Sequence, residues 1–175
     1  TVTDEPEILR LLTLMHAEGG MFALDEDCAR EMFARAFNRK GGIIGLIGPQ
    51  NDIRGMLYLL ITRAWYTRQN HLEELFCYVR PDSRKSNYAN DLLTFARKCS
   101  DEIGIPLSIG VLTNRQTEGK VRLYRRKFGD PAGAFFVHGA KWVNQQPGNE
   151  DFWRAPFSKV KRTNGADKPP ERAPI

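Results

Sequence analysis

The change of residue pattern at Pro81 constrains the fold of this chain more than any other feature of its sequence. A run of apolar and aromatic residues, His71–Val79, ends just before this proline, which cannot donate a hydrogen bond to a β-ladder. Apolar residues then recur at helical spacing from Ala89 to Cys99. Residues 71–93 are therefore predicted to form a strand, a short turn and the first turns of a helix.

This strand-to-helix turn has the character of an anion site. The first N–H groups of a helix lack intrahelical partners and lie at the positive end of the helix dipole. The cationic side chains of Arg84 and Lys85 adjoin them in the sequence. Most strand-to-helix turns bind no anion, so the turn by itself does not identify a ligand.

Two helices are predicted before the sheet. Asp4 and Glu7 have the spacing of a capping box at the start of the first helix. Asp25 is the expected N-cap of the second, and acidic residues follow it in the first turn. Apolar residues at helical spacing follow both starts, and a pair of glycines comes after each helix.

The remaining pattern predicts an α+β domain around a mixed central sheet flanked by helices. A polar turn joins two apolar runs into an antiparallel hairpin, which leads into the strand before Pro81. A nearly all-apolar run follows the next helix. This run has the pattern of a strand buried on both faces, and the intervening helix makes it a parallel neighbour of the strand before Pro81. The predicted helices are 4–19, 25–40, 87–103 and 116–127, and the predicted strands are 43–47, 53–66, 71–79 and 107–113, with a last strand or hairpin at 134–142.

The length of 175 residues suits one domain, which we expect to span residues 1–146, followed by a basic, proline-rich tail at 147–175. The sequence has no apolar run of about 18 residues and no signal-peptide pattern, so we expect a cytoplasmic protein without a membrane span. Its three cysteines and three histidines are scattered, which predicts reduced cysteines and no metal site.

The net charge of +5 is concentrated in the tail. From Arg154 onward, six Lys or Arg residues oppose two acidic residues, whereas the first 153 residues hold 20 basic and 19 acidic groups. A near-neutral body without an aromatic platform makes a nucleic acid the least favoured partner, since only the tail would support binding.

The turn after Pro81 resembles a known motif. The pattern Val79-x-Pro81-x-x-Arg84-x-x-Asn87-x-Ala89, between a strand and a helix, is similar to the acyl-CoA-binding motif of the GNAT N-acetyltransferases. In the family motif a glycine is usual where this chain has Asn87. The order of the predicted elements also agrees with the GNAT fold, and the likeness covers residues 8–142.

A second segment carries the same resemblance. Asn114 follows a predicted strand, and Tyr124-x-x-x-Phe128-Gly129 ends a predicted helix, as in the later Asn…Tyr-x-x-x-Gly-Phe segment of the family. The order Phe128-Gly129 is reversed relative to the commoner Gly-Phe.

The resemblance implies an acyl-CoA site between two parallel strands that splay apart, here 71–79 and 107–113. The pantetheine arm would hydrogen-bond to the backbone of Tyr78 and Val79 much as an added strand does. The pyrophosphate would meet the N–H groups of residues 84–89, with charge-assisted contacts from Arg84 and Lys85. The residues that the resemblance assigns to acetyl-CoA are Phe76, Tyr78, Val79, Arg84, Lys85, Ser86, Asn87, Tyr88, Ala89 and Asn114.

The resemblance also implies two catalytic groups. An amine must lose a proton before it attacks a thioester, and Glu73 or Glu74 would accept that proton, directly or through water. Only one of the two can face the acceptor, because successive strand residues point to opposite faces. The spacing of Glu73 from Phe76 favours Glu73. Tyr124 would protonate the departing thiolate or orient its sulfur.

The expected function is transfer of an acetyl group from acetyl-CoA to a primary amine by direct attack in a ternary complex. The alternative is a catalytically inactive CoA-binding or regulatory protein of the same fold. The acceptor amine, on a small molecule or a protein, is not specified by the sequence, and a homodimer is left open.

Overall fold

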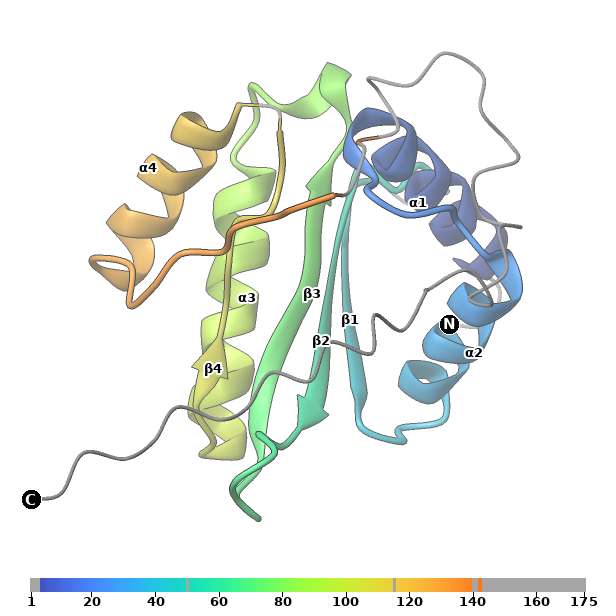
Figure 1. The fold of residues 1–175 in the computed structure, drawn as a ribbon. Helices are drawn as coiled ribbons and strands as arrows, with labels where there is room; N and C mark the ends of the chain where they lie inside the picture. Colours follow the sequence, from blue (N-terminus) through green and yellow to red (C-terminus); the bar gives the residue numbers. More distant parts are fainter. Residues whose placement is uncertain (1–3, 50, 115, 140–141, 143–175) are drawn as a thin grey trace, which may run out of the picture.

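The computed structural model of the chain describes residues 4–49, 51–114, 116–139 and 142. Over these residues the chain forms a four-stranded sheet with helices on both faces (Figure 1). The elements, in chain order, are α1 (Glu5–Gly19), α2 (Glu26–Phe37), β1 (Gly42–Ile47), β2 (Gly55–Thr62), β3 (His71–Val79), a short 3-10 helix (Pro81–Ser83), α3 (Tyr88–Ile103), β4 (Leu107–Ser108) and α4 (Thr117–Phe128).

The sheet is mixed, as the sequence predicts. Its strand order is β1-β2-β3-β4; the first three strands form an antiparallel meander, and β4 runs parallel to β3. The chain passes from β3 to β4 through α3, so the predicted βαβ unit is confirmed.

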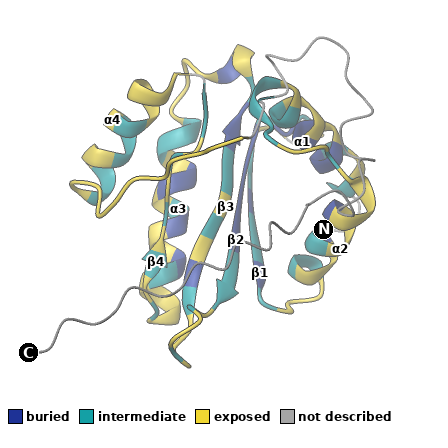
Figure 2. Ribbon diagram, viewed as in Figure 1, coloured by how far each residue is buried: buried dark blue, intermediate teal, exposed yellow. Residues whose placement is uncertain are grey.

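Two apolar clusters hold the layers together. Helices α1 and α2 pack on one face of the sheet, where Ile8, Phe33 and Tyr58 are fully buried. Helix α3 packs on the other face through Leu92 and Leu93. Helix α4 lies beside α3, and none of its described residues is buried (Figure 2).

The two predicted helix caps have different outcomes. Asp25 caps α2 as expected, because its side chain accepts hydrogen bonds from two N–H groups of the first turn. Asp4 makes no side-chain capping hydrogen bond within the described chain. Instead of closing a capping box, Glu7 accepts a 2.8 Å hydrogen bond from the N–H of Ile53. Glu7 therefore ties α1 to the segment before β2.

Strands β3 and β4 separate soon after they meet. In the described residues they pair only at Leu72–Leu107 and Glu73–Ser108. Beyond these pairs β3 continues to Val79 beside β2, whereas residues 109–114 form no strand. The expected splay of two parallel strands is therefore confirmed, and it opens at Glu74.

A β-bulge lies in β3 where the splay opens. Leu59 pairs with Glu74 and Tyr58 pairs with Phe76, so Leu75 has no partner on β2. A bulge breaks the alternation of side chains along a strand. Before Leu75 the even-numbered residues of β3, such as Leu72, face α3. After Leu75 the odd-numbered residues, Cys77 and Val79, face α3.

Three predicted strands differ from the structure. The predicted strand 107–113 is only two residues long, and its residues alternate between half-buried and exposed because it lies at the sheet edge with helices on one face. The predicted strand 134–142 is absent over residues 134–139 and 142, where Phe135 and Phe136 are exposed. Strand β2 also ends at Thr62, before the exposed residues 63–66.

Several expectations concern parts of the chain that the structure does not describe. The predicted tail, 147–175, and its boundary at residue 146 lie outside the described residues. None of the described helices is long and apolar enough to cross a membrane. Among the same residues, no group of three or more His, Cys, Asp or Glu side chains is arranged to hold a metal ion.

Candidate functional site

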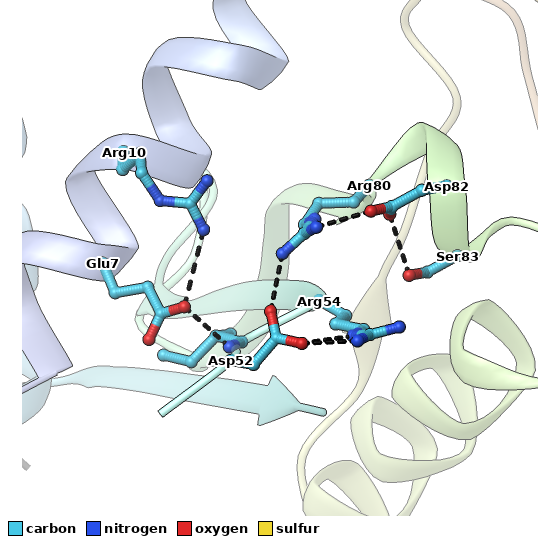
Figure 3. Close-up of polar contacts among 8 residues, drawn as sticks. Glu7, Arg10, Asp52, Arg54, Arg80, Asp82 and Ser83 are labelled. Carbon is cyan, nitrogen blue, oxygen red and sulfur yellow. Dashed lines mark hydrogen bonds and ion pairs between the residues drawn. The ribbon is translucent and has the colours of Figure 1, made fainter. Parts of the chain in front are cut away.

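A polar network fixes the turn between β3 and α3. Arg80 lies between two carboxylates, donating to Asp52 at 2.7 Å and to Asp82 on the other side (Figure 3). Arg54 also pairs with Asp52. These guanidinium groups lower the pKa values of both carboxyls. The turn after β3 is thereby anchored to the turn between β1 and β2.

The anchored turn borders a cavity of about 530 Å³. The walls come from the turn, from the start of α3 and from one side of α4. Five cationic or amide-bearing side chains stand among them, so the cavity has the polarity that an anion requires. The lining residues are Arg84, Ser86, Asn87, Ala89, Asn90, Gly119, Leu123, Arg126 and Lys127.

The first turn of α3 borders this cavity, which Ala89 and Asn90 line. Asn87 is the N-cap, and its side chain bonds to Asp91 at 2.6 Å rather than to a first-turn N–H. The φ of Asn87 is −83°, well outside the left-handed region that favours glycine. Asparagine in place of the glycine usual in the motif therefore carries no backbone strain.

Arg84 connects the turn to α1. Its guanidinium pairs with the carboxylate of Glu18 and also donates to the Val79 carbonyl at 3.1 Å. The Tyr78 hydroxyl donates to the same Glu18 carboxylate at 2.7 Å, and Arg84 lies 5.8 Å from the centre of the Tyr78 ring. The end of α1 therefore stands over the loop that borders the cavity.

A second polar cluster lies at the opening of the splay. The hydroxyl of Tyr124, on α4, donates a 2.7 Å hydrogen bond to Glu74 Oε1, on β3. Glu74 Oε2 is buried and has no hydrogen-bond partner in the described chain. Burial raises the Glu74 pKa to about 7, although Tyr124, the Gly110 backbone and Lys120 each lower it in part.

The neighbours of Glu74 share its low-polarity setting. Burial is the main reason that the pKa values of Tyr124 and Cys77 are raised, and the Glu74 charge raises both further. The pKa of Lys120 is lowered, first by desolvation and then by the Arg84 guanidinium. The cluster thus holds a carboxyl that titrates near neutral pH beside a phenol and a thiol that stay protonated.

The open edge of β3 offers backbone donors. The N–H of Leu72 bonds to the Pro106 carbonyl on the β4 side, and the N–H of Arg80 bonds to the Arg54 carbonyl on the β2 side. Backbone N–H groups alternate along a strand and shift once at the bulge. The N–H groups of Cys77 and Val79 therefore face the open side, and that of Tyr78 faces β2.

The structure brings most, but not all, of the predicted site residues together. Arg84, Ser86, Asn87 and Ala89 line the cavity. The side chains of Phe76 and Tyr78 pack in the α1–α2 core, and the N–H of Tyr78 faces β2 rather than the open edge where the pantetheine contact was expected. The other predicted members do not line the cavity: Lys85 is exposed, Tyr88 packs in the α3 core, and the side chain of Asn114 lies against Gly19.

The glutamate that belongs to the polar cluster is Glu74 rather than Glu73, because Glu73 is exposed and Glu74 accepts the hydrogen bond from Tyr124. The sequence motifs did not point to several other residues of the site. Cys77, Gly110 and Lys120 surround Glu74, and Arg126 and Lys127 line the cavity.

One signal for the α4 wall was present in the sequence. Gly119, Leu123, Arg126 and Lys127 are spaced by four, three and one residues, which places them on one face of a helix.

Several solved structures share this architecture, and acetyltransferases are among them. An integron cassette protein from a salt-marsh metagenome is 20% identical with a TM-score of 0.61, over 78% of this chain and 84% of that chain. An aminoglycoside acetyltransferase from an uncultured soil sample is 18% identical with a TM-score of 0.57, over 78% and 88%. A ribosomal-protein-alanine N-acetyltransferase from Brucella melitensis biovar Abortus is 15% identical with a TM-score of 0.60, over 78% and 92%.

The chain therefore has the GNAT acetyltransferase fold. No protein-family model and no curated protein matches its sequence. In this GNAT-fold chain the splayed strands are β3 and β4, the turn that holds Arg84 follows β3, and α4 carries Tyr124 to the splay.

Proposed function

We propose that this protein is an N-acetyltransferase that transfers the acetyl group of acetyl-CoA to a primary amine by direct attack in a ternary complex. The observation that carries the proposal is the Tyr124–Glu74 hydrogen bond at the opening of the splay. A carboxyl with a pKa of about 7 beside a phenol is suited to move a proton between two reacting groups.

The residues of the cavity fit the diphosphate end of CoA. Arg84, Arg126 and Lys127 supply positive charge, and the start of α3 supplies backbone donors. The open N–H groups of Cys77 and Val79 suit the amide-bearing arm, which can pair with a strand edge. When bound, acetyl-CoA supplies an acyl thioester that an amine can attack.

Glu74 is the proposed base. Its Oε2 atom is buried without a partner in the described chain and is available to accept a proton from the acceptor ammonium. A pKa of about 7 leaves a large fraction of Glu74 ionised at neutral pH, while making it a stronger base than an ordinary glutamate.

Tyr124 is the proposed acid. Its pKa is raised by burial and by the Glu74 charge, so a free tyrosinate is costly. Donation of its proton to a departing thiolate is therefore favourable only if a proton returns to the phenol at the same time. The hydrogen bond to Glu74 supplies that return path, and the proton taken from the amine leaves through Tyr124. A backbone N–H at the open edge of β3 would bind the oxyanion.

The sequence feature that favours the alternative function, a CoA-binding protein without catalysis, is Asn87 in place of the glycine usual in the motif. The φ of Asn87 is ordinary, so the backbone of the turn does not need a glycine at this position. The two functions differ in whether an amine makes the protein release thiol.

The test is thiol release from acetyl-CoA with a panel of polyamines, aminoglycosides, peptide N-termini and lysine peptides, alongside melting with and without CoA. Amine-dependent thiol release together with a CoA-dependent rise in Tm supports the proposal. A rise in Tm without release for any amine favours the non-catalytic alternative, and no change in Tm contradicts both.

A further inference from the structure

Lys120 is an amine of the chain itself that lies beside the proposed reaction centre. It precedes Tyr124 by one helical turn, so the two side chains leave α4 on the same face. The Lys120 ammonium reaches across to the Thr113 hydroxyl at 3.4 Å, on the segment that follows β4. The Lys120 side chain therefore bridges α4 and the segment after β4, on the side of the splay where Tyr124 contacts Glu74.

The position of Lys120 is also next to the cavity. Gly119 and Leu123 line the cavity, and Lys120 and Tyr124 follow them by one residue each around α4. A molecule that extends from the cavity to the Tyr124–Glu74 pair must pass this face of the helix. Of the two α4 lysines near this path, Lys127 lines the cavity itself, and Lys120 is the one whose charge acts on Glu74.

The charges around Lys120 come from both ends of the path. Arg84, at the cavity, and Glu18 act on its ammonium from one end, and Glu74 acts on it from the other. Although much of the residue is exposed, desolvation and the Arg84 charge lower its pKa. A lowered pKa increases the fraction of Lys120 that carries a nucleophilic lone pair.

We propose that Lys120 is an internal acceptor and becomes N-acetylated when the protein binds acetyl-CoA without an external amine. This inference rests on the proposed function and adds a modification site within the same centre.

The reaction balances with the groups at the site. The Lys120 ammonium gives one proton to Glu74, and its lone pair forms the N–C bond to the acyl carbon. The C–S bond breaks and its electron pair leaves with the sulfur, which takes a proton from Tyr124. Glu74 then returns a proton to Tyr124, and the second proton lost from the nitrogen goes to water. The products are N-acetyl-lysine, a free thiol and one released proton.

The modification would change the electrostatics of the centre. Acetylation removes a positive charge that acts on both Glu74 and Glu18. The side chain also becomes longer and neutral where it borders the splay. An acetylated protein would therefore differ from the unmodified one in how it holds an external amine.

The experiment is incubation of the full chain with acetyl-CoA and no amine, followed by intact mass and peptide mapping over time. Lys98 is the internal reference, because its side chain is 70% exposed on α3, away from the splay, and reports uncatalysed acetylation. We expect Lys120 to be acetylated at least about 10-fold faster than Lys98, as expected for an amine held near the thioester.

Two variants decide the cause of any modification. Lys120→Arg should lose the acetylation at this position and keep the CoA-dependent rise in Tm. Glu74→Gln should slow acetylation of Lys120 and leave Lys98 unchanged. If CoA raises Tm but Lys120 is modified no faster than Lys98, or equally fast in Glu74→Gln, the inference is overturned while the proposed function stands. If CoA does not raise Tm, the proposed function itself fails.

Discussion

The Tyr124 hydroxyl and the Glu74 carboxylate are joined by a 2.7 Å hydrogen bond between α4 and β3. Burial raises the pKa values of both groups, and each group affects the other. A change at either residue should therefore alter the titration of its partner as well as the chemistry at the splay.

The first prediction separates the two neighbouring glutamates. Glu74→Gln should reduce kcat by on the order of 100-fold or more, as expected for loss of a general base. Glu73→Gln is the matched control and should retain most activity, because Glu73 is exposed. In the wild type, kcat should rise with pH through about 7, where Glu74 loses its proton, and this rise should disappear in Glu74→Gln. The opposite ranking of the two variants would restore Glu73 as the base.

The second prediction concerns the hydrogen bond itself. Tyr124→Phe should lower kcat by on the order of 100-fold if Tyr124 protonates the leaving sulfur. The hydrogen bond from Tyr124 lowers the Glu74 pKa, so its loss should move the rising limb of the pH–rate profile above about 7. A loss of rate with an unmoved limb would mean that Tyr124 acts on the sulfur alone.

The third prediction links the site to stability. The folded-state pKa of Glu74 is above its ordinary value, so the folded protein binds more protons than the unfolded chain between about 4.5 and 7. Stability should therefore fall as pH rises through this range. Glu74→Gln should raise the free energy of unfolding at pH 8 by up to about 3 kcal/mol, and by much less at pH 5. Urea unfolding at both values tests this, with Glu73→Gln expected to show no such difference.

The fourth prediction concerns the cavity. Arg126→Glu should weaken CoA binding by about 10-fold or more, since it replaces a charge-assisted contact with repulsion. Arg122→Glu is the matched control on α4, because Arg122 is 69% exposed and does not line the cavity. Titration calorimetry with CoA measures both. Equal weakening in the two variants would indicate a general effect of charge rather than a cavity contact.

The sequence predicts the fold well where local chemistry sets it. Pro81 ends a strand, Gly104 ends α3 in the left-handed conformation, and Asp25 caps α2. The predicted capping box does not form, because Glu7 accepts a hydrogen bond from the N–H of Ile53 instead. This contact is 46 residues away in the sequence, so no local pattern predicts it.

The choice between Glu73 and Glu74 depended on a feature that the sequence does not display. Strict alternation would place Glu73 and Cys77 on one face of β3. The bulge at Leu75 shifts the alternation by one residue, so Glu74 shares the face of Cys77 and meets Tyr124. A bulge of this kind depends on pairing with β2, which is a long-range property.

The predicted strand 107–113 failed for a reason that lies in its neighbour. Residues 107–113 are apolar enough to form a strand, but β4 pairs over two residues and then diverges from β3. A strand requires a neighbour at hydrogen-bonding distance, whatever its composition. The divergence that removes this neighbour is also what opens the site.

The central claim is tested most directly by identifying the product of a reaction with an amine. Wild type, Glu74→Gln and Glu73→Gln would be incubated with acetyl-CoA and the amine panel, and acetylated amines would be measured by mass spectrometry. The account predicts an acetylated amine with wild type and Glu73→Gln, and on the order of 100-fold less with Glu74→Gln. Binding of CoA without acetylation of any amine, or equal product from Glu74→Gln and the wild type, would contradict it.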